Sequence, residues 1–181
     1  DATDLMVRSK LSPLCDMVRD CCVMIKQRAS EGLTHLLVAF ANNFVEVLEV
    51  QGNQHRSLRR VHAPEKCVLF SLHFSSACVH EGQSLMMASG NAFGKVTLWD
   101  FPYDEGWDGA RVPARITVTT HQGVIFRTRW SADQKYIATV ADDRTVRVFD
   151  ISERGGLDDE QRQVFEGWGH ISRVWDVVFV S

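Results

Sequence analysis

Strand-like segments recur in this sequence at a spacing near 50 residues, and this repetition constrains the fold more than any other feature. "SGNAFGKVTLWD" (89–100) aligns with "TVADDRTVRVFD" (139–150) at a shift of 50 residues. "HQGVIFRTRW" (121–130) aligns with "HISRVWDVVF" (170–179) at a shift of 49 residues. Because several independent segments share one spacing, we identify the chain as a repeat protein.

Each repeat consists of short segments rich in β-branched and aromatic residues. In the best-defined repeat, "VIFRTRW", "YIATVA" and "TVRVFD" are separated by "SADQK" and "DDR", in which Asp and Ser favour turns. "ARITVTT" precedes them and "RQVFEG" follows. Some strands, such as "LLVAF", are continuous apolar runs, which is typical of sheets covered on both faces. Four antiparallel strands recurring at this period predict an all-β propeller.

The repeats divide the chain into blades. We expect a degenerate blade with the lead-in to the next one (1–62), a second blade (63–120) with a long loop (101–116), the best-matching repeat (121–168) and the start of a further blade (169–181). About three blades do not close a propeller, because closure usually takes four to eight. An open propeller exposes sheet edges. We therefore expect part of a longer chain that carries the remainder of the propeller, in preference to closure by a second copy.

Composition indicates a soluble globular protein. Hydrophobic residues make up 45% and the net charge is −3, so no global field favours nucleic acid or membranes, although a local basic patch remains open. No segment approaches the roughly 18 apolar residues of a membrane span. The five cysteines lack Cys-x-x-Cys spacing. We therefore expect buried, reduced thiols in a cytoplasmic protein, not a disulfide framework or a zinc site.

The best repeat resembles the WD-repeat family. "WSADQKYIATVADDRTVRVFD" follows the family's "SPDG"-like turn and "LASGSxDxTVRLWD" pattern, while "GH" (169–170) and "LWD" (98–100) match the two ends of its repeat. The resemblance implies a propeller, most often with seven blades. It also implies a buried network in which Asp143 bonds His121 and His121 bonds Thr139. Phe149 replaces the closing tryptophan of that network, so one link is missing.

The same resemblance assigns structural positions in the other repeats. The second blade keeps Ser89 and Trp99, but it has Phe93 in place of the aspartate and Glu65 near the histidine position. We therefore expect its network to be absent and packing to hold it. His170 opens the next repeat.

Two catalytic interpretations of these residues compete with the structural one. His121, Thr139 and Asp143 could form a Thr-His-Asp constellation, and Asp142 with Asp143 a carboxylate pair. The family pattern places the first set in a blade network, no nucleophile elbow is present, and Asp142 suits a turn. No phosphate-binding glycine loop or metal-spaced cluster occurs. We expect a non-catalytic protein without metal or cofactor.

Two sets of residues are candidates for an interaction surface. Trp107 lies in the long loop, where it either anchors a partner or folds back on its own blade. The second set belongs to the third blade and the segment after it: Arg127, Arg129, Asp142, Arg144 and Arg173. Arginine suits phosphate recognition. The alternative is a solvated face with ion pairs to Asp133, Asp142 and Asp176.

A closer resemblance covers residues 35–181. "MMASGNAFGKVTLWDF", "HQGVIFRTRWSADQKYIATVADDRTVRVFDI" and "GWGHISRVWDVVF" are similar to consecutive blades in the first propeller of the WD repeat-containing protein 6 family. That resemblance implies a scaffold partner of an FtsJ-like tRNA 2′-O-methyltransferase, which helps to present the anticodon loop for wobble methylation, with tRNA held through the complex. The alternative is a generic adaptor, such as a ubiquitin-ligase substrate receptor or a signalling scaffold. The receptors' Trp-Asp-x-Arg is missing from "WDFP" and "FDIS".

Overall fold

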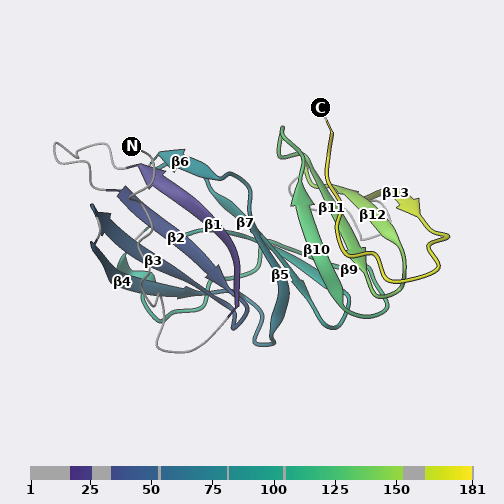
Figure 1. Cartoon of the computed structure of the whole chain (residues 1–181), viewed down its shortest axis with the longest axis horizontal. Helices are drawn as coiled ribbons and strands as arrows, with labels where there is room; N and C mark the ends of the chain where they lie inside the picture. Colours follow the sequence, from purple (N-terminus) through teal and green to yellow (C-terminus); the bar gives the residue numbers. More distant parts are fainter. Residues whose placement is uncertain are drawn as a thin grey trace.

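The chain forms an all-β segment of a propeller, as the repeats predict. The computed structural model describes residues 17–25, 34–52, 54–80, 82–103, 105–152 and 162–180. The described residues form three largely antiparallel sheets that follow one another along the chain and lie side by side (Figure 1). Each sheet contains one blade, whose own strands run from the inner edge to the outer edge in chain order, and the first sheet holds one additional strand.

The first blade consists of β1 (Val18–Ile25), β2 (Thr34–Phe40), β3 (Phe44–Gln51) and β4 (Gln54–His62). A fifth strand, β6 (Cys78–His80), pairs in parallel with the inner edge of β1. The repeat pattern did not predict β6, which comes from a connection within the second blade. It therefore ties the second blade to the first by backbone hydrogen bonds.

The second blade consists of β5 (Leu69–Phe74), β7 (Met86–Asn91), β8 (Lys95–Asp100) and β9 (Ile116–Thr119). The long connection between β8 and β9 contains a short 3₁₀ helix, η1 (Glu105–Trp107). This connection reaches back to the first blade, where the Ala110 carbonyl accepts from the His62 N–H at 2.9 Å.

The third blade consists of β10 (Ile125–Trp130), β11 (Tyr136–Ala141), β12 (Val146–Asp150) and β13 (Gln163–Gly167). The following segment, residues 173–180, is yellow in Figure 1 and runs along this blade without joining a strand ladder. Within this segment the Val174 N–H lies 3.5 Å from the Ala141 carbonyl oxygen.

The three inner strands share one irregularity. In the pairing of each inner strand with the second strand of its blade, one inner-strand residue is left over: Arg19 in β1, Phe70 in β5 and Phe126 in β10. This is a β-bulge, which bends the strand and re-aims a side chain. The bulge occupies the same place in every blade.

Apolar side chains fill the spaces between blades. Leu37, Leu72 and Trp99 belong to the cluster between the first two blades, and Ile125 and Phe149 to the cluster between the second and third. Trp99 is fully buried. Its burial contributes roughly 4–6 kcal/mol as an upper bound.

One buried polar pair joins the second and third blades at their inner strands. The hydroxyls of Ser71 and Thr128 lie 2.9 Å apart, and the Thr128 N–H donates to Ser71 Oγ at 2.8 Å. Because neither residue is accessible to water, this contact also fixes the register of one blade against the next.

The cysteines differ in part from the prediction. Cys21, Cys22, Cys67 and Cys78 are free thiols, as expected, but only Cys22 is buried, and Cys21 and Cys78 are exposed. The expectation of burial is wrong for these two because they lie on solvent-facing positions of alternating strands. Cys15 lies outside the described residues. Among the described residues, no helix has the length and apolarity required to cross a membrane.

Candidate functional site

The polar residues that resemble a catalytic constellation lie in the third blade. His121 lies between β9 and β10 with its side chain fully buried. Its Nδ1 is 2.9 Å from Asp143 Oδ2, and its Nε2 is 2.7 Å from Thr139 Oγ1. The Thr145 hydroxyl donates to Asp143 Oδ1 at 2.8 Å. Both imidazole nitrogens are thus engaged, and this geometry is the one the family resemblance implies.

The environment sets the charges of this network. Burial lowers the pKa of His121 and outweighs the opposing effect of Asp143. Burial alone would raise the pKa of Asp143, but hydrogen bonds from the Gln122 backbone and from Thr145 lower it overall. At neutral pH an ionised carboxylate therefore accepts from a neutral imidazole, whose Nε2 accepts from the Thr139 hydroxyl. Because Thr139 is also fully buried, this constellation presents no nucleophile to a substrate.

The second blade retains one link of the same network. Trp99 Nε1 donates to Ser89 Oγ at 2.8 Å in the buried interior. The expectation that this blade has no network is thus wrong for the Ser–Trp bond. Glu65 takes a different role from histidine, since its Oε1 accepts from the Thr97 hydroxyl at 3.0 Å. In the third blade Phe149 occupies the position of Trp99, and this buried side chain has no hydrogen-bond donor.

The turn between β7 and β8 shows how the second blade manages without the aspartate. Asn91 Oδ1 accepts from the backbone N–H groups of Phe93 at 2.8 Å and of Lys95 at 3.1 Å. Gly94, with φ +75°, presents its carbonyl to the His121 N–H at 3.0 Å. Sequence reasoning missed Asn91 and Gly94. The available signal was a side-chain acceptor followed by glycine in a tight turn.

Two predicted positions lie apart from this network. Trp107, in η1, is half-buried and packs against the core between the first two blades. Of its two alternatives, the structure shows the one in which it folds back on the protein. His170 follows β13 and is exposed, and no side-chain hydrogen bond of His170 occurs within the described part of the chain.

The predicted charged residues gather where residues 173–180 meet the third blade. Arg127 Nε lies 3.1 Å from Asp176 Oδ1, and Arg129 lies 3.5 Å from the same oxygen. Arg173 Nε lies 2.6 Å from Asp142 Oδ1. The structure thus pairs most of these arginines with two of the acids named from sequence.

Two members of this group are not paired in that way. Arg144 occupies the β11–β12 turn with φ +67° and is exposed. Asp133 accepts from the Ser131 hydroxyl at 2.6 Å and from the Lys135 N–H at 3.1 Å, so it caps its own turn and does not meet an arginine there.

A row of charged and polar side chains crosses the inner strands. His73 Nδ1 of β5 lies 2.9 Å from Asp20 Oδ2 of β1. His73 also contacts the guanidinium of Arg129 of β10, and Arg129 in turn forms an ion pair with Asp176. Sequence reasoning missed Asp20 and His73. The repeat alignment carries no signal for them because the corresponding positions hold different residue types in each blade.

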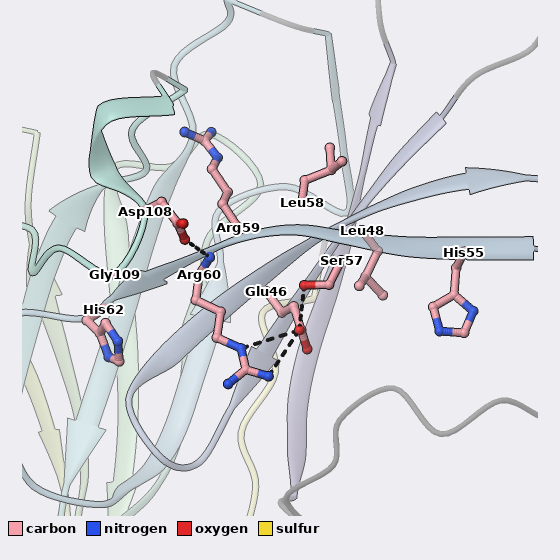
Figure 2. Close-up of a pocket in the computed structure, with 10 residues that line it drawn as sticks. All are labelled: Glu46, Leu48, His55, Ser57, Leu58, Arg59, Arg60, His62, Asp108 and Gly109. Carbon is pink, nitrogen blue, oxygen red and sulfur yellow. Dashed lines mark hydrogen bonds and ion pairs between the residues drawn. The ribbon is translucent and has the colours of Figure 1, made fainter.

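A cavity of about 510 Å³ lies against the outer strands β3 and β4 (Figure 2). Its most buried polar residue is Glu46, 2% exposed. Glu46 Oε1 accepts from the Ser57 hydroxyl at 2.8 Å and from the Arg60 guanidinium at 3.3 Å, as Figure 2 shows. The carboxylate is thereby neutralised by its own sheet. Among the described residues, no three His, Cys, Asp or Glu side chains form a metal-binding group.

These blades, with the Asp-His-Thr network in one and the Ser–Trp bond in the next, define a WD-repeat propeller. No family profile matches the chain. It is similar to a chain of the Chaetomium thermophilum Polycomb Repressive Complex 2 bound to GSK126, with a TM-score of 0.60 and 13% identity over 87% of this chain and 34% of that one. A chain of the Mitotic Checkpoint Complex gives a TM-score of 0.51 and 16% identity over 78% and 36%. Both likenesses show the fold.

The sequence matches are narrower. The chain is 31% identical over 102 residues, 54% of its length, to the tRNA (34-2′-O)-methyltransferase regulator WDR6 of Drosophila melanogaster. It is 27% identical over 67% of its length to WDR6 of Bos taurus, and 25% identical over 66% to WDR6 of Homo sapiens. In each case it spans 10% of the relative's length. The chain therefore has the fold of a WD-repeat propeller and resembles WDR6 over part of its length.

Proposed function

We propose that this chain belongs to a non-catalytic WD-repeat scaffold of the cytoplasm that binds an FtsJ-like tRNA 2′-O-methyltransferase and supports methylation of the wobble nucleotide. The observation that carries the proposal is the similarity to several regulators of a tRNA (34-2′-O)-methyltransferase. A regulator acts on an enzyme supplied by another chain, so the proposal requires a protein partner and brings tRNA in through the complex.

Two features of the structure support a scaffold role. Of the residues that resemble a catalytic triad, His121 and Thr139 are buried, and both are bonded within the network that includes Asp143, so they serve the blade. The arginines at the β11–β12 turn and in the segment after β13 remain accessible: Arg144 is exposed, and the Arg173 side chain is 55% exposed. Exposed arginines in loops that a blade positions are suited to docking a partner.

The experiment is affinity purification of the full-length protein from its own cells, with identification of the bound chains. The proposal predicts an FtsJ-like methyltransferase as the main stoichiometric partner. Arg144→Glu with Arg173→Glu should reduce its recovery, because charge reversal in an interface costs more than deletion. Arg56→Glu is the matched control, since Arg56 is 72% exposed but lies on the outer strand β4. Recovery of a cullin-ligase adaptor in place of the methyltransferase would favour the generic adaptor.

A further inference from the structure

Side chains at the bulges of the inner strands form a continuous row. The rings of Phe70 and Phe126 meet edge to face with centroids 6.5 Å apart. Phe126 and Trp175 follow with centroids 4.4 Å apart and planes inclined by 34°. At the other end, the Arg19 guanidinium lies 5.9 Å from the centre of the Phe70 ring. The row therefore runs across β1, β5, β10 and the segment 173–180.

The backbone explains why these side chains meet. Arg19, Phe70 and Phe126 are the bulge residues of their strands, and a bulge turns its side chain away from the regular alternation of the sheet. The row is thus built by the repeat itself. It differs from the core because Phe70 and Phe126 are only half-buried and Trp175 is 60% exposed. A row of accessible aromatic rings is a surface for a ligand with flat or apolar groups.

Positive charge borders the row, although the chain as a whole has a net charge of −3. The charged residues in the row, beside it or paired with its neighbours are Arg19, Arg127, Arg129, Arg173, Asp20, Asp142 and Asp176. The arginines exceed the aspartates there, so the local field attracts an anion. A ligand that carries both flat rings and negative charge would use the two features of the row together.

We propose that this row, with its arginines, is a binding site for unpaired bases of RNA. Aromatic side chains stack on nucleobases, and arginines neutralise the phosphates between them. Duplex RNA does not fit the same chemistry, because its bases are already stacked on one another. The inference rests on the proposed function in one respect, since the anticodon loop is the unpaired RNA that a wobble-methylating complex handles.

The test measures binding of a labelled, short, unstructured RNA to the full-length protein by fluorescence anisotropy, with a blunt duplex RNA and adenosine monophosphate as comparison probes. Phe126→Ala and Trp175→Ala should each weaken binding by about 5-fold to 100-fold, the range for loss of one stacked base. Phe126→Tyr should retain binding because it keeps the ring. Phe165→Ala is the control, since Phe165 is 53% exposed on the outer strand β13, away from the row.

Several results would overturn the site. The first is that Trp175→Ala binds the RNA as tightly as the unchanged protein, and the second is that Phe165→Ala weakens binding as much as the row variants do. The third is that the protein binds duplex RNA with the same affinity as the unstructured RNA. The fourth is that adenosine monophosphate displaces the RNA at a concentration similar to that of the RNA itself. Trp175→Ala removes a mostly exposed ring, so its folding is checked by an unchanged melting curve. Co-purification of the methyltransferase is scored separately. Its absence contradicts the proposed function, whereas its presence with unaltered RNA binding in the variants contradicts only this site.

Discussion

His121 and Asp143, 22 positions apart, lie 2.9 Å from each other and join the connection before β10 to the turn between β11 and β12. The same aspartate accepts from the Gln122 N–H at 3.0 Å. One carboxylate therefore fixes two loops at the same end of the third blade. The neighbouring Asp142 points to Arg173 and takes no part in this network.

Replacing Asp143 by alanine should destabilise the protein far more than the same change at Asp142. Asp143→Ala removes the carboxylate that accepts from the buried His121 N–H and leaves only the Thr145 hydroxyl, 3.1 Å from Nδ1, so the free energy of unfolding should fall by about 1–3 kcal/mol. Asp142→Ala removes one half-exposed ion pair, worth less than about 1 kcal/mol. Urea unfolding of both variants measures the difference. Equal losses would contradict a structural role for Asp143.

The network should make stability depend on pH. Burial lowers the pKa of His121 in the folded protein, so the unfolded chain binds a proton that the folded one does not. Stability from this group is therefore full above a pH of about 6.5 and falls as the pH decreases below it. Asp143 adds a loss only below a pH of about 4, because its pKa is also lowered.

The measurement is the urea midpoint between neutral and mildly acidic pH. His121→Gln should flatten the decline, and the part that remains includes the contribution of His62, whose pKa burial also lowers. His80→Gln, at an exposed position, should leave the decline unchanged. A decline of the same size in His121→Gln and the unchanged protein would refute the assignment.

The Ser89–Trp99 bond should be measurable by a double-mutant cycle. Trp99→Phe removes the indole N–H and leaves the buried Ser89 hydroxyl without its hydrogen-bond donor. The free energy of unfolding should therefore fall by about 1–3 kcal/mol in addition to the cost of the lost side-chain volume. Adding Ser89→Ala should recover part of that loss, because the orphaned hydroxyl disappears. Strictly additive losses would show that the bond contributes nothing.

Gly94 should tolerate no side chain. A Cβ there would lie 1.8 Å from the His121 carbonyl oxygen, and the backbone has φ +75°. Gly94→Ala should therefore cost about 3 kcal/mol or more. Gly82→Ala is the matched control, because Gly82 has φ +86° but open space around its Cβ position. That variant should cost about 1–2 kcal/mol, the strain alone. Similar melting temperatures for the two would contradict the close approach.

The repeat pattern predicted most of the fold because each blade uses the same local chemistry. The strands of the third blade and the turns between them follow from β-branched runs and Asp-containing turns, and the His121, Thr139 and Asp143 contacts follow from the family resemblance. β6 was not predictable, since a three-residue strand in a connection has no periodicity of its own and is fixed by pairing with β1.

The row at the bulges was also missed, for a physical reason. Phe70 and Phe126 read as ordinary members of apolar strands, and only the pairing register shows that each is the extra residue of a bulge. The ion pairs of Arg127 and Arg173 were anticipated as one alternative. Which acid each arginine meets depends on the path of residues 173–180, which local patterns do not specify.

The most direct test of the account is the ribose methylation of nucleotide 34 in tRNA from cells that lack the protein. The account predicts that this methylation is lost from substrate tRNAs and returns when the unchanged protein is restored, while the methyltransferase itself remains present. Normal methylation of nucleotide 34 in cells without the protein would contradict it.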